Sequence, residues 1–265
     1  MNSTIVFVHA HPDDEASGTG GTIARAAAEG HRVVLVVCTN GEHGERPDDL
    51  APCETLVDRR RRETARSAEI LGIERVVWLG YSDSGMHGWE QNAAAGSFWS
   101  ADIDEAGARL ADLLRDERAD IVVVYDWHGG YGHPDHIQVH RVGHRAADLA
   151  GTPQRFESTF NRDAGRRLSE SLRELGAPDG EEWDIDGPAD DGNPFGTPEA
   201  ELHLAVDVSD YIDAKRAALA AHASQTTDVT AMLNIPRDAF DTLFGTEWFI
   251  EPGAPPGLRT GFLVR

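Results

Sequence analysis

The chain has 265 residues, of which 46 are Asp or Glu and 24 are Lys or Arg, for a formal net charge of −22. This charge excludes nucleic acid and anionic membrane surfaces as main partners, because proteins bind both through Lys and Arg. A hydrophobic content of 40% excludes wholesale disorder, and the length is ample for a buried core.

Apolar strands alternate with helical patterns through the first part of the chain. Strands are predicted at 4–9, 32–38, 75–79 and 120–125, and helices at 22–29, 59–71, 102–117 and 137–149. The strands are continuously apolar, which is typical of a parallel sheet covered on both faces. We therefore predict an α/β fold, Rossmann-like and doubly wound, with a mostly parallel sheet in the strand order 3-2-1-4-5.

The pattern loosens after residue 150. We predict a helix at 162–175, a loop or flap at 177–198, a strand at 202–208, a helix capped by Ser209 that ends at His222, and short pieces at 230–233 and 247–250. No linker is apparent, so 1–265 is predicted as a single domain. Its Rossmann-like catalytic core would span 1–150, and 151–265 would form an elaborated, substrate-facing C-terminal part.

The acidic excess is concentrated in one segment. Between Glu174 and Ala214 there are 13 acidic residues and no Lys or Arg. This segment is either a solvated flap or a region that selects uncharged or cationic substrates.

The compartment is predicted from what the sequence lacks. The chain opens without a basic, apolar leader, and its longest apolar run, 33–38, is far shorter than a membrane span. Cys38 and Cys53 do not make a disulfide framework. We expect a cytoplasmic protein.

Two polar segments directly follow the first and fourth predicted strands. Residues 11–15 read His-Pro-Asp-Asp-Glu, and residues 129–136 read Gly-Gly-Tyr-Gly-His-Pro-Asp-His. In the strand order above these two strands are neighbours, and open parallel sheets bind ligands beyond the carboxyl ends of such strands. The two segments should therefore face each other across one crevice.

The residue types in this crevice suit metal-dependent hydrolysis. Two imidazoles and one carboxylate make a three-ligand zinc site with a position left for water. A second carboxylate can accept a proton from that water, and a free histidine can donate one.

Two alternatives stay open from the residues alone. His136, His140 and His144 lie four residues apart on one helix face, so spacing does not choose between His136 and His140 as a ligand, although His136 is nearer the strand end. Residues 18–21, Gly-Thr-Gly-Gly, also raise the alternative of a dinucleotide-binding oxidoreductase. They follow the strand by about nine residues, however, and no acid ends the second strand.

Residues 10–15 and 130–136 together resemble the PIG-L/LmbE-like family of zinc-dependent N-deacetylases, and most of all the actinobacterial deacetylases and amidases of mycothiol metabolism. The resemblance covers about 4–150, with a weaker stretch at 214–225. It implies hydrolysis of the acetamide of an N-acyl amino sugar or glycoside, a small-molecule substrate, with a mycothiol-like amide that carries a bulkier acyl group as the alternative. Homo-oligomer formation is left open.

The resemblance also implies roles for individual residues. The zinc ligands would be His11, Asp14 and His136, with ferrous iron as an alternative metal. Asp13 would be the general base, His133 the general acid that also helps to stabilise the oxyanion, Asp135 the residue that tunes or orients His133, and Tyr131 a group that polarises the carbonyl. Substrate contacts would come from Arg60, Asp83 and Glu45.

Overall fold

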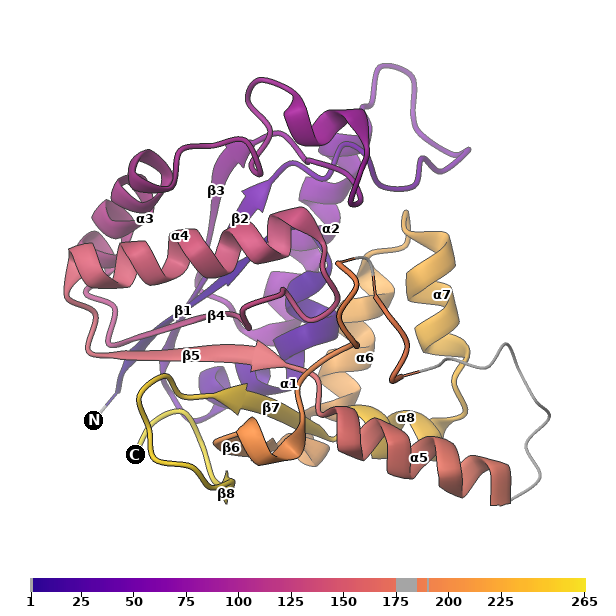
Figure 1. Ribbon diagram of the computed structural model, residues 1–265. Coiled ribbons are helices and arrows are strands. Elements are labelled where there is room, and N and C mark those ends of the chain that lie inside the picture. The colour runs from indigo at the N-terminus through magenta and orange to yellow at the C-terminus, as the bar shows by residue number, and fades with distance from the viewer. Residues whose placement is uncertain (1, 175–184, 190) are drawn as a thin grey trace.

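The computed structural model describes residues 2–174, 185–189 and 191–265. One sheet runs through both predicted parts of the chain, with eight strands in the order β3-β2-β1-β4-β5-β7-β6-β8 (Figure 1). The strands are β1 Thr4–His9, β2 Arg32–Thr39, β3 Arg75–Tyr81, β4 Ile121–Tyr125, β5 Gln154–Thr159, β6 Leu204–Asp207, β7 Thr246–Ile250 and β8 Arg259–Thr260.

The first five strands of the sheet are parallel, and antiparallel pairing begins where β7 joins β5. The predicted α/β class, the mostly parallel sheet and the 3-2-1-4-5 order are confirmed. Strand β5 is absent from the predicted elements because Phe156 is its only strongly apolar residue.

Helices cover both faces of the sheet (Figure 1). They are α1 Asp14–Ala28, α2 Leu56–Leu71, α3 Ile103–Glu117, α4 Pro134–Ala150, α5 Arg162–Glu174, α6 Ile212–Ala221, α7 Thr226–Asn234 and α8 Arg237–Phe244. Short 3₁₀ turns lie at Glu90–Ala93, Glu199–Glu201 and Ser209–Tyr211. No helix in the described ranges is long and apolar enough to cross a membrane.

The continuous apolar runs are explained by two cores, one on each face of the sheet. Successive residues of a strand point to opposite faces, so Ile5 and Phe7 pack under α1, α2 and α6, whereas Val6 and Val8 pack under α3 and α4. Strands β1, β2 and β4 therefore have no polar face, and their carboxyl ends lie between two packed layers.

Helix α1 begins at Asp14, eight residues before the predicted start, and includes the glycine-rich residues 18–21. Glycine lowers helix propensity, but here it allows close packing, since a Cβ at Gly21 would lie 2.5 Å from Val208. These glycines therefore do not form the phosphate-binding turn of a dinucleotide fold, and the oxidoreductase alternative loses its support.

The C-terminal part is more helical than predicted. Helices α7 and α8 span nine and eight residues, too few for their periodicity to stand out. Ser209 does not cap α6; it lies in a 3₁₀ turn, and its hydroxyl donates to the Asp207 carboxylate. The predicted loop at 177–198 falls partly outside the described residues, but its later part contacts the loop after β4 through the Gly196 amide, which donates to the Gly130 carbonyl at 2.7 Å.

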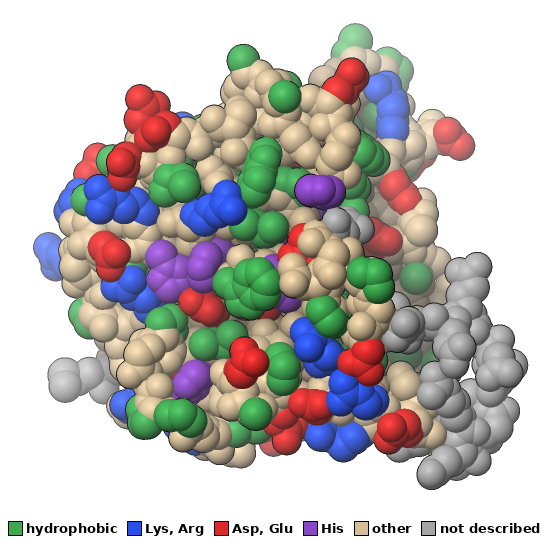
Figure 2. All heavy atoms as spheres, viewed as in Figure 1, with side chains coloured by type: hydrophobic (Ala, Val, Ile, Leu, Met, Phe, Trp, Pro, Cys, Tyr) green, Lys and Arg blue, Asp and Glu red, His purple; other side chains and the backbone are tan. Residues whose placement is uncertain are grey.

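Acidic and basic side chains are intermixed on the face of the molecule in Figure 2, where the described residues form no continuous basic surface.

A buried ion pair joins the C-terminal part to α1. The Lys215 ammonium donates to Glu247 at 2.6 Å, and the same carboxylate accepts the backbone amides of Gly21 and Thr22. We expect Lys215→Met to lower the free energy of unfolding by about 3–5 kcal/mol, because it leaves a buried charge uncompensated. Urea unfolding measures this change.

The matched control is Arg66→Ala, which removes the exposed pair with Glu69 and should change the unfolding free energy by less than about 1 kcal/mol. Equal small changes in both variants would contradict the structural importance of the buried pair.

Candidate functional site

A cleft of about 1240 Å³ opens at the carboxyl ends of β1 and β4. Every site residue predicted from the sequence lines it except Asp135, which is fully buried. Residues from α6, α7 and α8 line the other side. The structure thus brings together groups from all parts of the chain.

The Asp14 carboxylate lies between two imidazoles. Its Oδ2 atom is 3.5 Å from His11 Nδ1 and 3.5 Å from His136 Nε2. The other ring nitrogens face acceptors: His11 Nε2 lies 3.2 Å from the Asp135 carboxylate, and His136 Nδ1 lies 3.1 Å from the Gly129 carbonyl. Each of these nitrogens is therefore placed to donate its hydrogen, and in a neutral ring the nitrogen that faces Asp14 presents a lone pair.

This arrangement fits a bound cation. Three lone pairs that face one another repel unless a proton or a metal ion lies between them, and His136 Nε2 is buried with no hydrogen-bond partner. Partners on the far ring nitrogen are the usual way to fix a metal-binding histidine. His11, Asp14 and His136 can therefore hold a divalent metal.

The electrostatics agree with this assignment. Burial disfavours charge on Asp14, but His136 and His11 outweigh it and hold the pKa of Asp14 well below its usual range. Burial likewise opposes protonation of His11, yet the carboxylates of Asp83, Asp135 and Asp14 raise the pKa of His11 well above its usual value. Positive charge is favoured at this point.

Other groupings of possible ligand atoms lie close by, and some of their atoms already accept hydrogen bonds from the protein. Ligand atoms of His11, His133 and His136 fall within 4.8 Å of one another. His133 Nδ1, however, accepts the Asp135 amide. The Asp135 carboxylate accepts the amide and hydroxyl of Ser84.

The structure also separates His136 from the histidines that follow it. His140 does not line the cleft, and its Nδ1 donates to the Tyr125 carbonyl at 3.1 Å. His144 donates from Nε2 to Glu157 at 2.8 Å, while Arg155 donates to its Nδ1. Of these three histidines, His136 alone reaches Asp14, a choice that the spacing left open.

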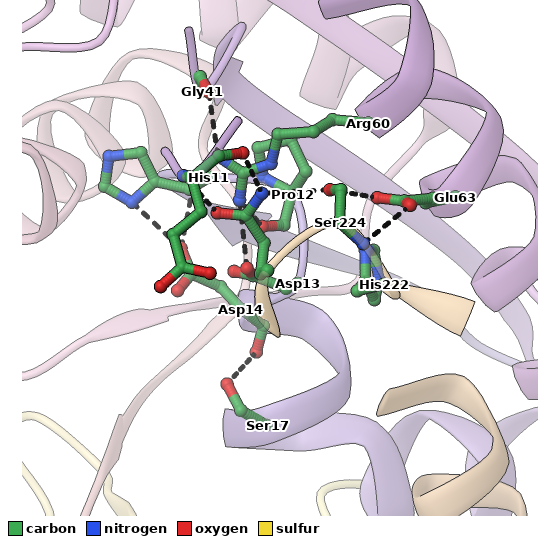
Figure 3. Close-up of polar contacts among 12 residues, drawn as sticks. His11, Pro12, Asp13, Asp14, Ser17, Gly41, Arg60, Glu63, His222 and Ser224 are labelled. Atoms are coloured by element: carbon green, nitrogen blue, oxygen red, sulfur yellow. Dashed lines mark hydrogen bonds and ion pairs between the residues drawn. The ribbon is translucent and has the colours of Figure 1, made fainter. Parts of the chain in front are cut away.

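Asp13 has an unusual backbone conformation. Its φ is +93°, in the left-handed region that non-glycine residues rarely adopt. Arg60 donates to its carboxylate at 2.9 Å and also to the carbonyls of Pro12 and Gly41 (Figure 3). Burial raises the pKa of Asp13 to about 6, with Arg60 opposing the shift. The carboxylate is thus a better proton acceptor than an ordinary aspartate.

Arg60 is one of four consecutive arginines, and the structure shows why it differs from the others. It is 3% exposed, whereas Arg59 and Arg62 pair with Glu54 and Arg61 lies over the Trp78 ring. The Arg60 guanidinium donates to the Asp13 carboxylate and to two backbone carbonyls. Its contact with substrate stays a prediction.

His133 begins α4 as its N-cap, and its Nδ1 accepts the Asp135 amide at 3.1 Å. Its hydrogen is therefore on Nε2. Burial, together with the charges of His11 and His136, lowers the pKa of His133 to about 2. A general acid would need a second proton on Nδ1, which this cap opposes, so the ring is better suited to donate a hydrogen bond.

The role predicted for Asp135 toward His133 stays a prediction, and its side chain lies against other residues. The Asp135 carboxylate contacts His11 and Ser84, and only its backbone amide reaches His133. The Asp135 side chain thus contacts His11, in the loop after β1, and Ser84, in the loop after β3. Asp135 therefore orients His11, a candidate metal ligand.

The remaining predicted residues, Asp83, Tyr131 and Glu45, also line the cleft. Burial disfavours charge on Asp83, but His11 and the Gly85 amide outweigh it and lower the pKa of Asp83. Tyr131 lies with its ring centroid 5.1 Å from that of His136. The Glu45 carboxylate accepts the Thr226 hydroxyl and the Thr227 amide, which hold its pKa at about 2; it thus caps α7.

The family model for GlcNAc-PI de-N-acetylase matches residues 6–147. The 1D-myo-inositol 2-acetamido-2-deoxy-alpha-D-glucopyranoside deacetylase of Streptomyces griseus is 40% identical, over 96% of this chain and 86% of the relative. The protein of the same name from Nocardiopsis dassonvillei is 38% identical, over 97% of this chain and 96% of the relative.

The chain belongs to the GlcNAc-PI de-N-acetylase family. It is therefore an enzyme of the deacetylase type, a hydrolase of amide C–N bonds.

Solved structures agree on the fold of this family member. A conserved protein of Thermus thermophilus matches with a TM-score of 0.63 and 26% identity, over 98% of this chain and 97% of that one. The N,N'-diacetylchitobiose deacetylase of Pyrococcus horikoshii matches with a TM-score of 0.61 and 22% identity, over 94% of this chain and 83% of that one.

Several supporting residues were not predicted from the sequence. Tyr125 stacks on His136 with ring centroids 4.2 Å apart, and its hydroxyl lies 2.8 Å from His9 Nδ1. Ser84 holds Asp135. Their positions after β3 and at the end of β4 are the only signal in the sequence, because such contacts depend on which strands are neighbours.

Metal binding tests the ligand assignment. We expect His136→Ala to abolish stoichiometric zinc binding, because it removes a ligand. Asp135→Asn should weaken affinity by about 10–100-fold, the usual effect of losing a residue that orients a ligand. Calorimetric titration and elemental analysis measure both.

His140→Ala is the matched control on the same helix, one turn from His136, and it should bind zinc as the unaltered protein does. Stoichiometric zinc in His136→Ala would refute the assignment.

Proposed function

We propose that this chain removes the acetyl group from the amide nitrogen of a 2-acetamido-2-deoxyglucoside of inositol, or of a closely related N-acyl amino sugar glycoside, in a metal-dependent reaction. The names of the curated relatives support this substrate class. The single observation that carries the proposal is the approach of His11 Nδ1 and His136 Nε2 to the Asp14 carboxylate, each at 3.5 Å, with the Asp13 carboxylate in the same cleft.

His11, Asp14 and His136 would hold the metal. A zinc ion bound there would polarise the amide carbonyl and lower the pKa of water, and ferrous iron accepts similar ligands.

In this proposal Asp13 handles the protons. Its carboxylate accepts a proton as the oxygen of water adds to the amide carbon. The C–N bond then breaks, and the amine nitrogen takes that proton from Asp13. One water is consumed, acetic acid, which ionises in solution, and a primary amine are released, and Asp13 returns to its starting state. The raised pKa of Asp13, about 6, suits both transfers.

Two groups would stabilise the oxygen on which negative charge develops. Tyr131 and the Nε2 hydrogen of His133 both line the cleft, and hydrogen bonds to a developing oxyanion are a large part of catalysis in acyl transfer. The amine proton is assigned to Asp13 instead of His133 because His133 Nδ1 accepts a backbone amide.

Asp83 is the proposed direct contact for a sugar hydroxyl, since it lines the cleft. Arg60 and Glu45 would act by shaping the walls, because their charged groups already bind Asp13 and the start of α7.

The cleft itself favours a second candidate, an amidase for an amide with a bulkier acyl group. One wall is apolar, formed by side chains such as Phe195, Met232, Phe244 and Trp248, and the volume of about 1240 Å³ is large for a single disaccharide-sized ligand.

The reaction can be tested with a panel of N-acetyl glucosaminides, including the inositol glycoside, and mycothiol-like amides. We expect equal amounts of acetate and primary amine from the inositol glycoside, loss of turnover with chelator, and recovery when zinc or ferrous iron is restored. No acetate from any member would refute the deacetylase, and faster release of a larger acid would favour the amidase.

Asp13→Asn tests the proton acceptor. It should lower kcat by about 10²–10⁴-fold while zinc stays bound, because it removes only the basic group. The exposed Asp112→Asn is the control and should retain full kcat. A kcat near that of the unaltered protein in Asp13→Asn would exclude this role.

A further inference from the structure

Asp13 occupies the N-cap position of α1 without using its side chain as a cap. An Asp at this position normally accepts a hydrogen bond from an amide of the first helical turn. Here the side chain instead meets Arg60 at 2.9 Å. The backbone conformation, with φ at +93°, is what separates the carboxylate from the helix, and non-glycine residues keep it only when their surroundings enforce it.

The Glu15 carboxylate supplies that enforcement. Its Oε2 atom accepts the Asp13 amide at 3.0 Å, so a carboxylate of the first helical turn satisfies the amide of the N-cap residue, as in a capping box but from N2 instead of N3. Its Oε1 atom accepts the Ser67 hydroxyl at 2.5 Å and lies 2.7 Å from His222 Nε2. Glu15, Ser67 and His222 are all fully buried, so the carboxylate is held from two sides.

These partners come from distant parts of the chain. Arg60, Glu63 and Ser67 are spaced three and four residues apart and are all buried, so they form a polar stripe on one face of α2. Glu63 accepts the amide and hydroxyl of Ser224, two residues after His222, which caps the end of α6 (Figure 3). One helix therefore contacts Asp13 through Arg60 and holds Glu15 through Ser67.

We propose that Glu15, fixed by Ser67 and His222, is a positioning residue that holds the Asp13 backbone in its left-handed conformation and so directs the Asp13 carboxylate into the cleft. The inference rests on the proposed function of Asp13 as the proton acceptor. It also assigns a role to the C-terminal part beyond substrate contact, because His222 must be docked for Glu15 to be held.

Kinetics of Glu15→Gln and Ser67→Ala test the proposal. Glu15→Gln should lower kcat by about 100-fold, the effect of a small displacement of a reacting group. Ser67→Ala should lower kcat by about tenfold, as expected for one lost hydrogen bond. KM and zinc content should stay within about twofold, because neither residue contacts substrate or metal.

Thr64→Val is the matched control. Thr64 is also buried on α2, but its hydroxyl donates only to the Arg60 carbonyl at 2.9 Å. It should keep the kcat of the unaltered protein. Equal losses of kcat in Thr64→Val and Ser67→Ala would overturn the proposal, since they would reflect general disturbance of α2.

A double-variant cycle separates positioning from a merely structural role. If Glu15 acts through Asp13, adding Glu15→Gln to Asp13→Asn should reduce the residual rate no further. A further 100-fold loss in the double variant would overturn the proposal.

Hydrogen exchange of the Asp13 amide, measured by NMR on protein without metal, gives a readout independent of activity. This amide should exchange slowly in the unaltered protein and in Thr64→Val, and at least about tenfold faster in Ser67→Ala. Slow exchange in Ser67→Ala would overturn the positioning role. Absence of turnover in the unaltered protein, with this exchange pattern intact, would instead refute the proposed function.

Discussion

Three lone pairs that face one another, on His11, Asp14 and His136, are the constraint on which the rest of the site depends. Two atoms separated by 3.5 Å, each with a lone pair toward the other, are stable in a buried cleft only with positive charge between them. The surrounding contacts serve to keep this arrangement. Asp135 and the Gly129 carbonyl set the hydrogens of the two rings, and Tyr125 stacks on His136.

The close approach of these three side chains requires that the loops after β1 and β4 begin at fixed positions. The proposed ligands follow β1 and β4, which lie side by side and are apolar on both faces. Rigid, doubly covered strands fix where each loop begins, and such fixed elements are what precise sites require. Asp13 is the N-cap residue directly before Asp14. In the usual N-cap conformation its side chain would bond to the first helical turn, and the left-handed conformation directs it elsewhere.

The C-terminal part contributes in two ways. It supplies the apolar wall of the cleft, with Phe244 and Trp248, and it supplies His222 behind Glu15. The buried pair between Lys215 and Glu247 attaches this part to α1. The C-terminal part thus shapes the cleft that would receive substrate. It also contacts the residues that support Asp13.

By itself the sequence determined the α/β class, the parallel strand order and the convergence of residues 11–15 with 129–136. These follow from apolar runs and from the chain order, which are local. Only the tertiary structure showed that Arg60 differs from its three neighbours by holding Asp13, and that His136 meets Asp14 while His140 does not. It alone showed that Asp135 faces His11, and that Glu15 is held by a histidine from the far end of the chain. Which partner a polar side chain meets depends on neighbouring strands and helices brought together over long separations, and no local pattern encodes that.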